Sequence, residues 1–179
     1  MQQEQGGNRR RGVIRESVTA ASGAGWPPAF VALYSAERTG LVRAAFLICG
    51  SIASAEDAVH DAVERVAARW LGVDDARSYL YVAVVNAARD AARRDRRSLL
   101  FTGGRVGETG DDLAGVSADA MELRAALVRL PVNQRAALVL RFFLDWDDDE
   151  IAQQFDVRPA TVRSWVHRGI TRLRRDMGQ

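Results

Sequence analysis

The sequence contains one cysteine and no lysine, and it contains no long apolar run. The single thiol, at Cys49, excludes an intramolecular disulfide framework and a thiolate metal cluster within one chain, because both need several sulfurs. All 25 basic residues are arginines, which stay charged and present planar donors. The most hydrophobic run, 41–49, contains Arg43 and is shorter than the roughly 20 residues that a membrane span needs. We therefore expect a cytoplasmic protein that does not insert into a membrane.

The length and composition suggest how the chain is divided. Its 179 residues allow one large domain or two small ones, and an apolar content of 47% is ample for packed cores. Residues 1–27 are rich in Gln, Gly, Ser and Arg without a periodic apolar face, which is typical of a flexible arm. Residues 99–119 contain five glycines and four acids with few large apolar residues. This segment is predicted to be a linker between two domains, 28–98 and 120–179.

Apolar residues recur at helical spacing throughout the first of these domains. From residue 30 onward they predict either one long helix or a pair broken at Gly40. Ser54, with Asp57 three residues later, resembles a capping box at the start of another helix. Asp74 or Asp75 can cap the helix that follows.

The second domain shows the same helical periodicity. One helix should stop near Pro131, and Leu138, Phe142 and Trp146 mark another helix behind it. No convincing strand is found anywhere in the sequence. The fold class is therefore predicted to be all-α, with two small helical domains joined by a flexible linker.

The end of the chain carries the most specific local pattern. Asp147 begins a short helix with Glu150 in its first turn, and a tight turn follows from Asp156 to Pro159. Proline suits the first turn of the second helix, where its missing N–H has no intrahelical partner to lose. Two short helices joined by such a turn are predicted to form a helix-turn-helix.

Arginine is concentrated in two segments. Residues 76–98 hold six arginines against two acids, for a local charge of +4, and residues 158–179 hold six against one, for +5. In the first segment, Arg89, Arg93 and Arg97 recur every fourth residue beside Asn86, opposite the predicted apolar stripe. Such a face can follow phosphates and reach base edges, whereas the alternative is a solvated helix surface.

The second arginine-rich segment is the predicted recognition helix of the helix-turn-helix. The first turns of such a helix enter the major groove, where arginine can read guanine. A basic helix that only complements its own dipole is the alternative, and it fits Arg172, Arg174 and Arg175 better than Arg163. The sequence leaves two interpretations of Trp165 open: its ring packs on the preceding helix, or it stacks beside DNA. The outward side chains of this helix are Arg158, Thr161, Arg163, Ser164, His167 and Arg168.

The sequence contains few candidates for catalytic or metal-binding residues. His60 and Asp61 are adjacent, as in metal-dependent phosphohydrolases, but the second histidine, His167, lies in an unrelated element. The acidic run 145–150 lacks the spacing and central glycine of a calcium loop, so we expect it to cap a helix and complement the helix dipole. We expect no catalytic residue, no metal and no cofactor.

Two sets of motifs resemble a known family. Residues 55–63 read Ala-Glu-Asp-Ala-Val-His-Asp-Ala-Val, and with Tyr79-Leu80, Val85-Asn86 and the following arginines they resemble region 2 of bacterial extracytoplasmic-function sigma factors. Residues 130–135, 149–152 and 161–168 resemble their region 4. The order and spacing of the two sets match group 4 of the sigma-70 family, of the SigE-like actinobacterial type. Asp156 stands where a glycine is usual in that family.

The resemblance implies a role for each element. Region 2 would dock on the clamp helices of the largest RNA polymerase subunit through Asp57, Asp61 and Glu64. The helix Arg158–Arg168 would read the −35 element, and region 4 would also meet the polymerase flap. The −10 element would be opened and read by Leu71, Asp74, Asp75, Tyr79, Asn86, Arg89, Arg93, Arg94 and Arg97.

The resemblance also implies partners and a mode of control. The partners are core RNA polymerase, promoter DNA and an anti-sigma protein that holds the two domains, with control by synthesis alone as the alternative. The glycine-rich linker leads us to expect a loose relative placement of the domains in the free protein. The alternative function is a stand-alone helix-turn-helix regulator.

Overall fold

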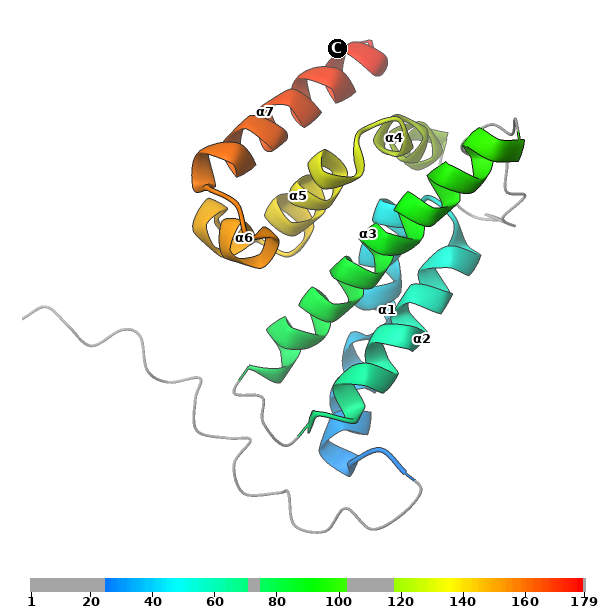
Figure 1. Ribbon diagram of the computed structural model, residues 1–179, viewed down its shortest axis with the longest axis vertical. Helices are drawn as coiled ribbons and strands as arrows, with labels where there is room; N and C mark the ends of the chain where they lie inside the picture. The colour runs from blue at the N-terminus through cyan, green and yellow to red at the C-terminus, as the bar shows by residue number, and fades with distance from the viewer. Residues whose placement is uncertain (1–24, 71–74, 103–117, 179) are drawn as a thin grey trace, which may run out of the picture.

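In the computed structural model, residues 25–70, 75–102 and 118–178 are described, and they are helical with no strand. Figure 1 shows the order of the elements along the chain. The all-α prediction is confirmed. The helices are α1 (Pro28–Cys49), α2 (Ile52–Ala67), α3 (Ala76–Thr102), α4 (Ala118–Val128), α5 (Val132–Phe143), α6 (Asp148–Phe155) and α7 (Pro159–Asp176).

Helices α1, α2 and α3 pack side by side and form the first helical unit (Figure 1). α1 is one continuous helix, so of the two alternatives the long helix is correct and the pair broken at Gly40 is not formed. A side chain at Gly40 would meet the hydroxyl of Tyr81, and the glycine thus lets α3 approach α1 closely. Trp26 belongs to this unit rather than to an arm, because its ring lies edge-on to Phe30, 5.4 Å away between centroids.

The caps of these helices follow the predictions only in part. The predicted capping box at Ser54 is wrong: α2 starts after Ser51, whose hydroxyl accepts the backbone N–H of Ser54 at 3.4 Å. The hydroxyl of Ser54 instead donates to Asp95 of α3 at 2.9 Å. Asp75 caps α3 as predicted, since its carboxylate accepts the backbone N–H of Ser78 at 3.1 Å. α3 continues to Thr102, four residues past the predicted end of the domain.

Helices α4 to α7 form the second helical unit. α4 ends at Val128, close to Pro131, where the sequence predicted that a helix stops. α5 begins after Pro131, but its apolar face differs from the prediction. Phe142 is 66% exposed, and Trp146 lies beyond the end of the helix. The buried side chains of α5 are those of Val132, Arg135, Ala136, Ala137, Leu138, Val139 and Leu140.

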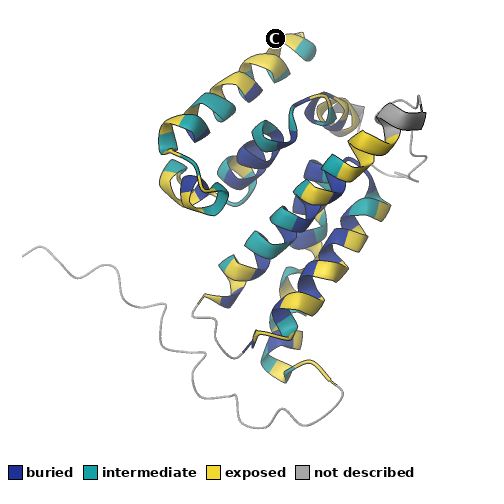
Figure 2. Cartoon of the chain, in the orientation of Figure 1, coloured by how far each residue is buried: buried dark blue, intermediate teal, exposed yellow. Residues whose placement is uncertain are grey.

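The two units pack on each other, with α5 against α1 and α3, and α4 against α1 (Figure 1). Most of their buried residues form one cluster, which holds residues of both units from Phe30 to Val162, while Leu127, Leu130 and Leu138 form a smaller one. Figure 2 shows that buried residues line the facing sides of the helices. At the junction, Arg124 of α4 is buried and donates to the carbonyl of Gly50 at 2.9 Å. The sequence led us to expect that the two domains are loosely placed relative to each other, whereas in the structure the two units pack on each other. The reason is that α5 is apolar on two sides, toward α7 and toward the first unit. The glycine-rich core of the predicted linker, 103–117, lies outside the described residues.

No helix in the described part of the chain is long and apolar enough to cross a membrane.

Candidate nucleic-acid interface

The helix-turn-helix is built from strong local signals, as predicted. Asp147 is the N-cap of α6, and its carboxylate accepts the backbone N–H of Glu150 at 2.8 Å. The Glu150 carboxylate accepts the backbone N–H of Asp147 at 2.8 Å in return, which completes a capping box. Three acids in the first turn also complement the helix dipole. Ile151 and Ala152 are buried beneath α7.

The turn between α6 and α7 depends on an unusual backbone at Asp156. This residue ends α6 in the left-handed conformation, with φ of 51° and ψ of 52°. Glycine adopts this conformation freely, while aspartate is among the few other residues that tolerate it. Arg158 is extended, and Pro159 opens α7, as the sequence predicted. α7 thus leaves the turn with a fixed direction.

The outward face of α7 is accessible. Arg158, Arg163, His167 and Arg168 are exposed, while Thr161 and Ser164 are half-buried at the edges of the face. The Arg163 guanidinium lies 3.9 Å from the Asp148 carboxylate, and the side chain of this arginine is 62% exposed. We call these six residues the α7 outward face.

Sequence reasoning did not single out Gly169, which fixes α7 from behind. This glycine is buried, and a Cβ there would lie 2.8 Å from a terminal methyl carbon of Leu138. The missing side chain lets α7 lie close on α5. A glycine in the middle of a strongly helical pattern was the available signal, because such a glycine usually has a packing reason.

Trp165 is positioned by packing. Its ring lies 5.9 Å from the ring of Phe155 on α6, between centroids, and the residue also lines a cavity toward α3. The structure therefore favours the packing interpretation over stacking beside DNA.

Part of the basic face of α3 is covered by the second helical unit and is not exposed to solvent. The Arg89 guanidinium lies over the ring of Phe155, 3.9 Å from its centroid, and donates to the side-chain oxygen of Asn133 at 3.0 Å. Arg93 donates to the same oxygen at 3.0 Å. Burial lowers the pKa of Arg89 from its usual range. The sequence correctly placed these arginines away from the core of the first unit, but it gave no sign that the second unit covers them.

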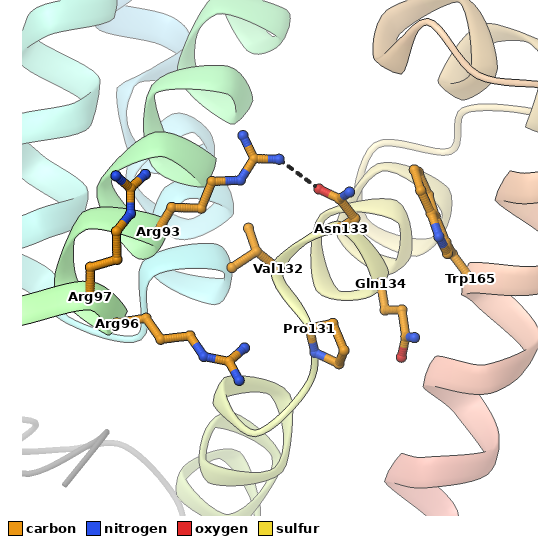
Figure 3. A pocket seen from close by; sticks show the side chains of 8 residues that line it. All are labelled: Arg93, Arg96, Arg97, Pro131, Val132, Asn133, Gln134 and Trp165. Atoms are coloured by element: carbon orange, nitrogen blue, oxygen red, sulfur yellow. Dashed lines mark hydrogen bonds between the residues drawn. The ribbon is translucent and has the colours of Figure 1, made fainter. Parts of the chain in front are cut away.

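A cavity of about 410 Å³ lies beside this contact. Figure 3 shows Arg93 and Asn133 meeting across it, with Arg96 and Arg97 on the α3 side and Trp165 on the far wall. Arg94 and Arg97 are exposed, so the C-terminal part of the predicted face stays accessible. Asn86 is half-buried, and its side-chain oxygen accepts from Arg89 at 3.2 Å.

The start of α3 is tied to α1. Glu37 accepts from Arg77 at 2.7 Å and from the Tyr81 hydroxyl at 2.9 Å. The hydrogen bond from Arg77 lowers the pKa of Glu37, while burial raises the pKa of Tyr81 to about 12. Tyr79, which lies between Arg77 and Tyr81 in the sequence, is exposed. Leu71 and Asp74 lie outside the described residues, so their predicted roles remain predictions.

Glu37→Gln should reduce the stability of the fold at neutral pH. The carboxylate in a charge-assisted bond is replaced by an amide, and we expect a loss of about 1 kcal/mol, since the exposure of Arg77 weakens the pair. Because the folded-state pKa of Glu37 lies below its usual 4.5, its contribution is present above that pH and is lost as pH falls through the folded-state value. Urea unfolding at several pH values should show wild type and variant converging in acid. A constant difference at every pH would contradict this role.

The predicted polymerase-binding acids lie together. Asp57, Asp61 and Glu64 of α2 are all exposed, and their spacing places them along one side of the helix. Glu64 also lies 3.3 Å from His60, which is exposed as well. This acidic side of α2 is opposite its buried residues, so it is available to a partner.

Comparison with known proteins identifies the family. The sequence profile "Sigma-70, region 4" matches residues 120–173, which include α6 and most of α7. The "ECF RNA polymerase sigma factor SigM" of Mycobacterium tuberculosis is 32% identical over 164 residues, covering 90% of this chain and 83% of that protein. The chain belongs to the extracytoplasmic-function sigma factors. The "RNA polymerase sigma-E factor" of Streptomyces avermitilis is 28% identical to this sigma factor over 140 residues, covering 76% and 78% of the two chains.

A solved structure supports the same fold. The sigma factor RpoE of Bartonella quintana, in complex with the anti-sigma factor NepR, matches this sigma factor with a TM-score of 0.68. The match covers 84% of this chain and 97% of that chain at 20% identity, so the likeness concerns the fold. As a sigma factor, the protein is a transcription initiation factor and not an enzyme. The alternative of a stand-alone regulator is not favoured.

Proposed function

We propose that this sigma factor directs core RNA polymerase in the cytoplasm to promoters whose −35 element is read by the α7 outward face. The observation that carries this proposal is the accessibility of that face while the opposite side of α7 is packed on α5 and α6. A recognition helix needs both conditions, because its side chains must reach base edges from a fixed position. Arginines at 163 and 168 supply donors that can form paired hydrogen bonds with guanine.

The first helical unit would act on the −10 element and on polymerase. The loop before Asp75 and the α3 arginines would hold the displaced strand, since cations follow phosphates and offset the loss of base stacking. The ties from Glu37 to Arg77 and Tyr81 support this role, because they fix the start of α3 beside the loop. The exposed acids Asp57, Asp61 and Glu64 would meet the clamp helices of the largest subunit.

A run-off transcription assay tests the proposal directly. The full chain is added to purified core polymerase with a library of promoter fragments, and the transcripts are sequenced to define the promoters used. Specific initiation that requires both proteins supports the proposal. Tight binding to DNA without any transcription would contradict it and would point to the stand-alone regulator.

Arg163→Ala and Arg168→Ala should weaken initiation in different ways at different promoters. Loss of a base contact removes roughly 1–3 kcal/mol of discrimination at one base pair, while loss of a phosphate contact weakens all sequences alike. The measurement is run-off transcription from a set of promoters in which each −35 base pair is changed in turn.

Arg172→Ala is the matched control, because Arg172 is exposed on the same helix but lies beyond its first turns. We expect this variant to keep the wild-type sequence preference. If all three variants transcribe every promoter like wild type, α7 does not read the −35 element.

A further inference from the structure

The cavity between α3 and the start of α5 has one strongly basic wall. Its volume of about 410 Å³ is in the range of roughly 300–1,000 Å³ that is usual for small-molecule sites. Arg93, Arg96 and Arg97 line it from α3 (Figure 3), and no acid lines it among the described residues. Arg96 and Arg97 are exposed and have no ion-pair partner in the described part of the chain. Their guanidiniums are therefore available to an anion that enters the cavity.

The start of α5 forms another part of the cavity wall and also favours an anion. Its N-cap is Pro131, which provides no side-chain hydrogen bond, and its first turn contains no acid. The first N–H groups of a helix carry a partial positive charge. This helix start therefore adds to the positive potential that the arginines of α3 create.

A buried cation without partners lies next to the cavity. Arg135 directly follows Gln134, which lines the cavity, and it is only 4% exposed. Its Nε and Nη1 atoms have no hydrogen-bond partner among the described residues. Burial lowers the pKa of this guanidinium to about 10, and the charge of nearby Arg96 acts in the same direction. An anion bound beside Arg96 would offset the repulsion between these two cations.

The far wall of the cavity provides an aromatic ring. Trp165 is half-buried and is held by the ring of Phe155, 5.9 Å away between centroids. Such a fixed indole can stack with a nucleobase, because every base has an aromatic face. Figure 3 shows Gln134 between the arginines and Trp165, and its amide can both donate and accept a hydrogen bond. The cavity thus combines a site for negative charge with a site for a flat ring.

We propose that this cavity binds a nucleoside polyphosphate, with its phosphates at Arg96 and Arg97 and its base on the ring of Trp165. Arginine guanidiniums match phosphate oxygens in pairs of hydrogen bonds. Neither Arg96 nor Trp165 belongs to the residues proposed to contact the −10 or the −35 element. The inference therefore goes beyond the proposed function.

The charge in the cavity favours a polyphosphate over a strand of nucleic acid. Three guanidiniums from two successive turns of α3 line a single cavity. A polyphosphate chain carries several negative charges within the space of a few atoms, whereas a strand carries one charge for each nucleotide. A strand would also need its cations spread along a groove.

Calorimetric titration of the full chain with ATP is the first test. Tripolyphosphate and adenosine are titrated separately, because each has only one half of the proposed ligand. We expect ATP to bind more tightly than tripolyphosphate, and adenosine to bind much more weakly than both. The affinity for ATP should fall as salt rises, since salt screens the phosphates from the guanidiniums.

Three variants separate the two halves of the site. Arg96→Gln should weaken the binding of ATP and of tripolyphosphate about fivefold to tenfold, because it removes a charge-assisted hydrogen bond. Trp165→Leu should weaken ATP about fivefold or more and leave tripolyphosphate unchanged, because only the stacking is lost. Trp165→Phe keeps an aromatic ring against Phe155 and should retain most of the affinity for ATP. Arg129→Gln is the matched control for charge, since Arg129 is exposed close to Pro131 but does not line the cavity.

Nuclear magnetic resonance locates the bound ligand. The four tryptophans give four indole N–H signals, and the signal missing from Trp165→Phe is that of Trp165. ATP should shift this signal in the wild-type protein and shift it less in Arg96→Gln. The signals of Trp26 and Trp70 should stay in place, because both rings pack on Phe30 in the first helical unit.

Several results would overturn the site. They are the absence of ATP binding at millimolar concentration, an equal loss of affinity in Arg129→Gln and Arg96→Gln, and an unshifted Trp165 signal at saturation. Binding of an oligonucleotide without binding of ATP would assign the cavity to a nucleic-acid strand instead and would also contradict the proposal. None of these measurements uses polymerase or a promoter, so a negative result leaves the proposed function as it stands.

Discussion

Reversing the charge at both Arg89 and Arg93 is expected to impair strand opening severely while core polymerase binding is retained. A base taken out of the duplex stack costs a few kcal/mol, so losing two cations beside the strand should reduce opening roughly a hundredfold. The doubly substituted protein, Arg89→Glu with Arg93→Glu, is assembled with core polymerase on a promoter. The reactivity of the −10 thymines to permanganate is then compared with wild type.

The control for this experiment is Arg43→Glu, because Arg43 is exposed on α1 outside every proposed contact. The charge reversal should also remove the hydrogen bonds that Arg89 and Arg93 donate to Asn133. Normal permanganate reactivity in the double variant would remove α3 from the melting step.

Gly50→Val should be the most destabilising single change. Gly50 ends α1 with φ of +83°, which a β-branched residue adopts only with strain, and its added side chain would collide with Val128 of α4. Backbone strain and overpacking together should reduce the free energy of unfolding by about 3 kcal/mol or more. Urea unfolding measures this loss. The carbonyl of the same residue accepts from Arg124, so the junction between α1 and α4 should loosen as well.

Gly178→Val is the matched control for this position. Gly178 has a φ of +73° and no atom within 4 Å of an added Cβ, so it carries the backbone strain without the collision. We expect little change there, since Gly178 is exposed and lies beyond the last residue of α7. An equally small effect at Gly50 would show that the junction of the two units can rearrange freely.

The sequence predicted the elements whose signals are local. The helix-turn-helix was predicted because Asp147, Glu150, Asp156 and Pro159 act within a few residues of their own positions. The predicted start of α2 was wrong because two serines three residues apart both suit a cap. The hydrogen bond to Asp95 of α3 selects between them. Local chemistry could not distinguish the two.

The covered part of the α3 face was beyond prediction for a different reason. A row of arginines has the same sequence pattern whether it faces water, DNA or another part of the chain. The contact with Asn133 joins residues 44 positions apart, and the sequence around either residue gives no sign of the other. Phe155 lies four residues after the buried Ile151, a spacing typical of a core residue of α6, yet it is half-buried and lies under Arg89. Only the tertiary arrangement shows that these residues meet.

The acidic first turn of α6 has a consequence for binding to non-target DNA. Asp148 lies close to Arg163, and Asp149 and Glu150 are exposed in the same turn, next to the helix that would enter the groove. These carboxylates repel phosphates, so contacts that rely on charge alone become weaker, whereas hydrogen bonds to bases are affected less. Six arginines in residues 158–179 would otherwise hold the protein on any sequence. The acidic first turn thus stabilises α6 and would also shorten the time that the factor stays bound to non-target DNA.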